Sequence, residues 1–174
     1  IPNLNFRISG MAIDTTGTLW GFMENSDNLL KISPDFSYKI YKLKNLMSSE
    51  PLIKNIDETI FILSFQDKLK ISTYDIKTDS FVNLQIKHNI NYPTNIAIND
   101  FVKISSNNYL IATNIGILQY KDGVISYRFG KNHSLTNNAK AIKIFSNHEI
   151  WIGTENGLTA FYINEFAVFN RADG

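Results

Sequence analysis

Three histidines and two pairs of carboxylates are the side chains best suited to acid–base or metal chemistry in this 174-residue sequence. None of His88, His133 and His148 has a histidine or carboxylate two or four residues away. Ligands that share a strand or a helical turn need such spacings to reach one metal ion. The sequence therefore predicts histidines in solvated loops, and no metal site.

The carboxylate pairs could in principle form the acid–base pair of a glycosidase. Asp75 lies close in sequence to Asp79, and Glu149 lies close to Glu155. Glycosidases hold two carboxyl groups roughly 5–10 Å apart. Each of these four acids, however, falls in a predicted turn or beside one. We therefore expect no catalytic residue, while a hydrolase or lyase stays open as an alternative.

Two short motifs come near known sites without matching them. The stretch "IDTTGTLW" (13–20) is similar to the Asp-box S-x-D-x-G-x-x-W, but its glycine and its tryptophan each stand one residue too far from Asp14. The stretch "FGKNHS" (129–134) has a Gly-Lys pair but lacks the upstream glycine of a phosphate-binding loop. No Asp-rich calcium loop is present either, so we expect no bound cofactor.

The composition excludes several classes of function. The net charge is +1, with 17 basic and 16 acidic residues spread along the chain, so no basic stripe indicates nucleic-acid binding. Cysteine is absent, which excludes disulfides, thiolate metal sites and cysteine nucleophiles. The longest apolar runs, such as "TIFILSF" (59–65), are too short to cross a membrane. The first residue is Ile1 and no signal peptide is seen, so we expect a piece of a longer protein.

The sequence predicts that the elements that would position such a site are β-strands. Alternating apolar and polar residues recur in runs of four to seven, including "KIYKL", "FVNLQI", "VISYRF" and "LTAFYI". Turn residues separate them every eight to twelve positions. The chain also has 25 Ile, which favours strands, and 21 Asn, which tolerates the positive φ of tight turns. These features predict an all-β protein: a sandwich, a barrel or a propeller.

An internal repeat separates these three possibilities. When four strand-like runs are aligned, a large apolar residue recurs at Trp20, Phe61, Leu110 and Trp151. These residues are 41, 49 and 41 positions apart. The strand that follows each run ends at Ile32, Tyr74, Tyr120 and Tyr162. These ends are 42, 46 and 42 residues apart. Each unit holds four strand-like runs, and such a period predicts propeller blades. We predict about four antiparallel blades, at approximately 7–45, 46–88, 89–131 and 132–174.

The predicted blade explains the order of residues in "EIWIGTENGL" (149–158). A large side chain on the second strand fills the gap between neighbouring sheets. A glycine before the leucine allows a tight turn into the third strand, and the threonine hydroxyl can bind backbone near that turn. We likewise expect Asp122-Gly123 to form the hairpin turn between the last two strands of the third unit.

The repeat resembles that of a known family. In "IDTTGTLWG" (13–21) and "IWIGTENGL" (150–158), the Asp, Gly, Trp, Thr and Gly-Leu residues are similar to the two-component regulator propeller repeat, roughly D-x-x-G-x-L-W-I-G-T-x-x-G-L. The third unit keeps Thr113 and Gly116, with Leu110 replacing the tryptophan, and the second unit fits only by spacing. The closing "FNRADG" resembles the start of a further unit, so we expect a fragment of a longer array.

The resemblance implies a function. Such repeats form the periplasmic sensor region of hybrid two-component systems, ahead of an immunoglobulin-like domain, a membrane helix, a histidine kinase and a response regulator. A ligand, often an oligosaccharide, binds outside and biases kinase activity inside. By this resemblance the chain would be a periplasmic sensor segment that is itself no enzyme, reaching the membrane only through the rest of its parent. A scaffold propeller that binds proteins and no small ligand is the main alternative.

The sequence does not identify the ligand-binding residues. Sugars stack on aromatic faces, but most of the 22 aromatic residues fall at predicted packing positions. Those outside the pattern, Phe22, Tyr92 and Phe101, cannot be assigned to one surface, so we name no ligand residue. Four blades also leave a physical problem, because an open array exposes unpaired apolar faces. We expect either tight closure of four blades or, preferably, a homodimer.

Overall fold

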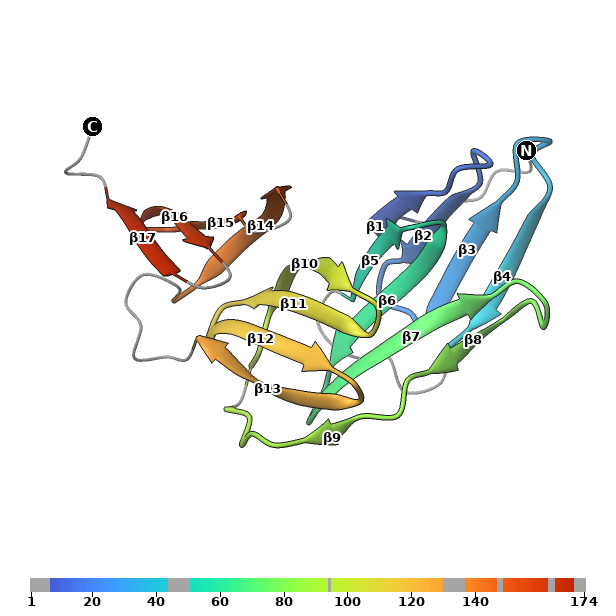
Figure 1. Cartoon of the computed structure of the whole chain (residues 1–174). Coiled ribbons are helices and arrows are strands. Elements are labelled where there is room, and N and C mark those ends of the chain that lie inside the picture. Colours follow the sequence, from blue (N-terminus) through green and yellow to red (C-terminus); the bar gives the residue numbers. More distant parts are fainter. Residues whose placement is uncertain are drawn as a thin grey trace. The chain divides into compact units, whose positions relative to one another are not determined.

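The described part of the chain is built from β-strands alone. The computed structural model describes residues 7–43, 51–93, 95–129, 137–146, 149–162 and 165–170, and no helix occurs among them. The strands form four sheets, each with an antiparallel core of four consecutive strands, as Figure 1 shows. The predicted all-β class is confirmed. The chain divides into two compact units, Ile1–Leu84 and Gln85–Gly174.

The first unit holds two sheets whose strands pair in chain order. The strands of the first sheet are β1 (Ile8–Ile13), β2 (Leu19–Met23), β3 (Asn28–Ile32) and β4 (Tyr38–Lys42). Those of the second are β5 (Leu52–Ile56), β6 (Thr59–Phe65), β7 (Leu69–Asp75) and β8 (Ser80–Asn83).

The second unit repeats this plan with one addition. The strands of the third sheet are β10 (Ile98–Ser105), β11 (Asn108–Thr113), β12 (Gly116–Lys121) and β13 (Val124–Phe129). Those of the fourth are β14 (Ala139–Ser146), β15 (Glu149–Thr154), β16 (Gly157–Tyr162) and β17 (Glu165–Asn170). The short strand β9 (Lys87–His88) pairs in parallel with β13 and extends the third sheet to five strands.

The strand β9 differs from the sequence expectation. The repeat predicts that the second blade ends at residue 88, but Lys87 and His88 pair with Val124 and Ile125 of the third sheet. Two residues are too few to show an alternating pattern, so the sequence carried no signal for this strand. The other proposed blade limits stay predictions.

The hairpin turns form where the sequence supplies residues that tolerate positive φ. Asp122 and Gly123, with φ of 47° and 83°, form the predicted two-residue turn between β12 and β13. A second turn recurs between the second and third strands of the last two sheets. There the Thr113 hydroxyl donates to the Gly116 carbonyl at 2.7 Å, and Thr154 donates to that of Gly157 at 3.2 Å. The predicted role of the threonine is confirmed.

The repeated large residue packs one sheet on the next. Trp20, Phe61, Leu110 and Trp151 all lie on the second strand of their sheets. In the first unit Trp20 is 1% exposed and belongs to a cluster that joins the first two sheets. In the second unit Leu110 packs with Ile142, Ile150 and Ile152 of the fourth sheet. Alternating residues of one strand thus face neighbouring sheets.

The second repeat landmark is offset in the last sheet. Ile32 pairs with Leu19 and Tyr120 pairs with Tyr109, each the residue just before the large one. Tyr162 instead pairs with Glu149, which lies two positions before Trp151. The equivalent position in the fourth sheet is therefore Phe161, which pairs with Ile150.

Candidate functional site

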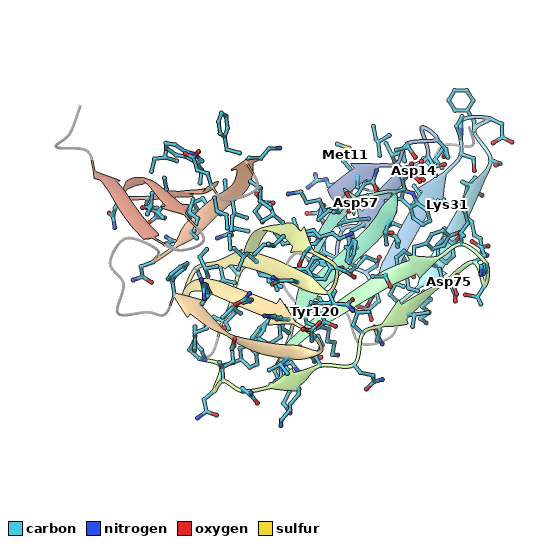
Figure 2. All side chains as sticks on the ribbon, in the orientation of Figure 1. Met11, Asp14, Lys31, Asp57, Asp75 and Tyr120 are labelled. Atoms are coloured by element: carbon cyan, nitrogen blue, oxygen red, sulfur yellow. The ribbon has the colours of Figure 1, made fainter. Side chains whose placement is uncertain are left out.

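Seven charged and aromatic side chains form a connected group in the first unit. We name it the aromatic–carboxylate cluster; its members are Trp20, Lys31, Lys39, Tyr41, Tyr74, Asp79 and Phe81. Strands β3 and β4 of the first sheet supply its lysines and Tyr41. Strands β7 and β8 and the turn between them supply Tyr74, Phe81 and Asp79. The cluster therefore joins the outer hairpins of two successive sheets, and Figure 2 labels Lys31 within it.

Asp79 organises the polar half of this cluster. Its carboxylate accepts hydrogen bonds from the Lys39 ammonium and from the hydroxyls of Tyr41 and Tyr74. The Lys31 ammonium lies 3.8 Å from the carboxylate and donates to the Tyr74 hydroxyl at 3.0 Å. That ammonium also lies 5.0 Å from the ring centre of Trp20, within the range of a cation–π contact. Two cations and two hydroxyls thus surround one carboxylate.

This environment sets the ionisation of the cluster. The hydrogen bonds from Lys39, Tyr41 and Tyr74 hold the pKa of Asp79 well below its usual value, since each favours the charged form. Burial, followed by the bond to Asp79, raises the pKa of Tyr41 well above its usual value. The carboxylate therefore stays charged and the phenol stays neutral at any physiological pH. The cluster is a structural link between the first two sheets.

Neither predicted pair of carboxylates forms a glycosidase-like site. The Asp75 carboxylate accepts from the Lys77 amide at 2.9 Å and from the Thr78 hydroxyl at 3.0 Å, bonds that lower its pKa. Both Asp75 and Asp79 thus lack the raised pKa that a general acid requires. In the other pair, Glu149 begins strand β15 and Glu155 follows its end, which separates them by roughly 20 Å at the usual rise per residue.

Asp14 forms a turn rather than a ligand site. Its carboxylate accepts from the amides of Thr16 and Thr18, both at 3.0 Å, and from the indole nitrogen of Trp20 at 3.0 Å. Partial burial tends to raise the pKa of Asp14, but these bonds and that of the Thr16 hydroxyl outweigh it and lower the pKa. The Asp14 side chain therefore anchors the β1–β2 turn and orients the tryptophan that packs on the second sheet.

The connection between β8 and β10 is the long segment of the second unit. In residues 85–97 the side chains of Ile86, His88, Ile90 and Tyr92 are half-buried. The residues between them are exposed and polar: Gln85, Lys87, Asn89 and Asn91. We name the described residues of this segment, 85–93 and 95–97, the amide-rich connection.

Hydrogen bonds hold the amide-rich connection on the third sheet. The amide of Lys87 donates to the Gly123 carbonyl at 2.7 Å, and that of Asn89 donates to the Ile125 carbonyl at 3.0 Å. The Asn114 side chain accepts from the Ala97 amide at 3.0 Å. The connection is therefore bonded to the third sheet on both sides of Asn91 and Tyr92.

The histidines and the off-pattern aromatic residues lie in the core, on the amide-rich connection or outside the described residues. His88 lies 2.7 Å from the Tyr92 hydroxyl through its Nδ1, on the amide-rich connection. His133 and His148 lie outside the described residues, as does all of "FGKNHS" except its phenylalanine. Phe22 and Phe101 are each 1% exposed and belong to the core. Of the three off-pattern aromatics, Tyr92 alone is half-buried rather than buried.

Sequence reasoning missed the aromatic–carboxylate cluster, although a signal for it exists. Lys39 and Tyr41 bind Asp79 across 40 and 38 residues, and Lys31 binds Tyr74 across 43. In the second unit, the Ile142 amide donates to Asp100 across 42 residues. These separations are close to the repeat period. The one pair of opposite charges among them, Lys39 and Asp79, is therefore the signal that could have indicated a contact between successive sheets.

Two negative findings apply to the described residues. Within the ranges given above, no group of three or more His, Asp or Glu side chains could hold a metal ion. In the same part of the chain, no helix is long and apolar enough to span a bilayer.

Solved structures share this fold along nearly the whole chain. The extracellular domain of BT4673 from B. thetaiotaomicron, assigned as a hybrid two-component system, matches with a TM-score of 0.70 and 16% identity over 99% of this chain and 24% of its own. The extracellular domain of BT3049, assigned likewise and from the same organism, has a TM-score of 0.61 and 18% identity, over 95% of this chain and 24% of its own.

An enzyme has the same fold. A catalytically inactive virginiamycin B lyase from Staphylococcus aureus, solved with quinupristin, gives a TM-score of 0.70 at 14% identity over 98% of this chain and 57% of its own. The chain thus spans about a quarter of the two sensor domains and just over half of the lyase. No protein-family model and no curated protein matches the sequence.

These matches establish the fold. The chain is a β-propeller segment of about four antiparallel blades with four-stranded cores, as the sequence predicted. Two of the three structures are extracellular domains of hybrid two-component systems, the class of protein that the sequence motif resembles.

Proposed function

We propose that the chain is an extracytoplasmic, ligand-sensing propeller segment of a hybrid two-component sensor. The observation that carries this proposal is the agreement of two independent comparisons. The repeat motif around Trp20 and Trp151 resembles the two-component regulator propeller repeat. Separately, the fold matches the extracellular domain of BT4673 over 99% of the chain. On this proposal the segment lies in the periplasm and its parent carries the signal across the membrane.

The amide-rich connection is the ligand-contacting surface we propose. Amide side chains can donate to and accept from sugar hydroxyls, and an aromatic ring can stack on the apolar face of a sugar. Asn89 and Asn91 are exposed beside Tyr92, whose hydroxyl is held by His88. The backbone there is fixed by its bonds to the third sheet, so little order must be gained on binding. An oligosaccharide is the ligand that this surface fits best.

On this proposal the segment binds its ligand and does not convert it chemically. Asp75, Asp79 and Glu155 all have lowered pKa values, so none of them is suited to donate a proton near neutral pH. The signalling chemistry would belong to the remainder of the parent protein.

Calorimetric titration with size-fractionated oligosaccharides from single purified polysaccharides tests the proposal. We expect saturable binding of one fraction, and at least a tenfold weaker affinity for Tyr92→Ala. Phe36→Ala is the matched control, because Phe36 is an exposed aromatic residue on a turn of the other unit. Binding that is unaffected by Tyr92→Ala would remove the amide-rich connection from the proposal, and binding of no fraction would favour a protein-binding scaffold.

A lyase is the second candidate, favoured by the equal TM-score of virginiamycin B lyase. Product analysis by mass spectrometry after incubation with the same oligosaccharides and with streptogramin B antibiotics separates the two. Unchanged substrates support the sensor. Catalytic turnover that follows protein concentration would replace the sensor proposal with an enzyme.

A further inference from the structure

An exposed lysine of the amide-rich connection lies close to a second lysine of the third sheet. Val124 of β13 pairs with Lys87 of β9 on one side and with Lys121 of β12 on the other. Figure 1 shows the three strands in this order at the edge of the sheet. Paired residues point to the same face, and two strand spacings separate the lysines by about 10 Å. Both side chains are exposed, so one ligand can contact both ammonium groups.

Polar side chains extend this surface along both neighbouring strands. Ser126 lies two residues after Val124 on β13, and Asn89 lies two residues after Lys87, in a segment where exposed and half-buried residues alternate. Successive residues of an extended strand point to opposite faces, so Ser126 and Asn89 share the face of the lysines. The Asn89 amide donates to the Ile125 carbonyl at 3.0 Å, which holds Asn89 alongside β13. We name this surface the basic face; its members are Lys87, Asn89, Lys121 and Ser126.

The charge of the basic face is not neutralised by the residues that the structure describes. Among those residues, no carboxylate lies within ion-pair distance of Lys87 or Lys121. The described residues between 85 and 129 carry four Lys and Arg and two Asp, which gives a net charge of +2 with histidine neutral. One of these acids, Asp100, already accepts from the Ile142 amide at 3.0 Å, and the other, Asp122, lies in the turn after Lys121. The face therefore stays positive even when Asp122 is counted.

We propose that the ligand of the amide-rich connection is an acidic oligosaccharide, whose sugar units carry carboxylate or sulfate groups beside their hydroxyls. The inference rests on the proposed function and adds the charge of the ligand to it. Lys87 and Lys121 donate charge-assisted hydrogen bonds to the anionic groups, which are stronger than bonds between neutral groups. Asn89 and Ser126 bind sugar hydroxyls, because an amide and a hydroxyl can each donate and accept. Both lysines are exposed, so salt screens their attraction to the ligand.

Calorimetric titration with matched acidic and neutral oligosaccharides tests the inference. The acidic probes are oligogalacturonides, alginate oligosaccharides and carrageenan oligosaccharides. Each is compared with the same oligosaccharide made neutral, by carboxyl reduction for the first two and by desulfation for the third. We expect an acidic probe to bind about tenfold more tightly than its neutral counterpart. The affinity for that probe should fall severalfold between low and high sodium chloride, since screening weakens exposed charge pairs.

A double substitution locates the contact on the basic face. Lys87→Gln combined with Lys121→Gln should weaken binding of the acidic probe about tenfold and leave the neutral counterpart unaffected. Lys42→Gln combined with Lys68→Gln is the matched control, because both are exposed lysines of the first unit and the net charge changes equally. The control should bind like the wild type. Circular dichroism checks that both double variants are folded.

The outcomes separate this inference from the proposed function. Equal affinities for acidic probes and their neutral counterparts would overturn the inference, as would acidic binding that the Lys87→Gln and Lys121→Gln substitutions leave unchanged. If neutral oligosaccharides alone bind, and Tyr92→Ala weakens that binding, the inference is wrong and the proposed function stands. If neither acidic nor neutral oligosaccharides bind, both are wrong.

Discussion

At the scale of single residues, carboxylates in this protein serve as structural acceptors. Asp14 orients Trp20 through a 3.0 Å hydrogen bond to its indole, and Asp79 joins two hairpins through Lys39 and the tyrosines. Both have lowered pKa values because the bonds favour the charged form. A residue type that sequence analysis considers for catalysis is thus used to connect successive sheets.

The lowered pKa of Asp79 predicts that the folded protein loses stability in acid. Its folded pKa lies below the usual value of 3.8, so its contribution is fully present above about pH 4 and declines as the pH falls further. Asp79→Asn should lower the free energy of unfolding by on the order of 1 kcal/mol at pH 7, since the side chain is 43% exposed and solvent screens the ion pairs.

Urea denaturation of both proteins between pH 7 and pH 2.5 measures this. The difference between wild type and Asp79→Asn should be constant down to pH 5 and shrink below pH 4. Other acids with lowered pKa values cancel in the difference. A difference that grows as the pH falls would contradict the assigned direction of the shift.

At the scale of elements, the strands and their turns follow from local sequence. Alternation located four consecutive strands in each of the third and fourth sheets, though not β9, and Asp122-Gly123 identified its hairpin turn, because both signals act over a few residues. Contacts across the repeat period were missed, since no local pattern connects Lys39 with Asp79. The exposed amides of residues 85–97 were missed for the same reason: their fixed backbone depends on the distant residues Gly123 and Ile125.

The recurring threonine turn gives a matched pair of substitutions. Thr113 is fully buried, and its hydroxyl both donates to the Gly116 carbonyl and accepts from the Ile115 amide. Thr113→Val removes both bonds and should cost about 1–3 kcal/mol, the penalty for buried polar groups left without partners. Thr154→Val removes the equivalent bonds in a half-exposed turn, where water can replace them, and should cost less than 1 kcal/mol.

Thermal unfolding of the two variants, followed by circular dichroism, compares them directly. Equal losses of stability would show that burial does not distinguish the two turns.

At the scale of the whole molecule, the chain is one small sheet repeated with variations. The two landmark positions predicted its period, although the second landmark is offset by one residue in the fourth sheet. Two properties could not be predicted from spacing. The fifth strand of the third sheet is too short to give a pattern, and the exposure of Met11 and Leu158 depends on which faces the array covers. The repeat therefore determines the sheets, while their neighbours determine the role of each face.

The large second-strand residue is the central contact of this fold, because it packs one sheet on the next. Equilibrium urea unfolding of Trp20→Ala and Trp151→Ala, at a concentration where the chain is monomeric, tests it most directly. Trp20 is buried between two sheets, so Trp20→Ala should cost roughly 3–5 kcal/mol. Trp151 is at the equivalent position but half-buried, and Trp151→Ala should cost about 1 kcal/mol. Similar losses for the two, or a loss below 1 kcal/mol for Trp20→Ala, would contradict the packing of successive sheets described above.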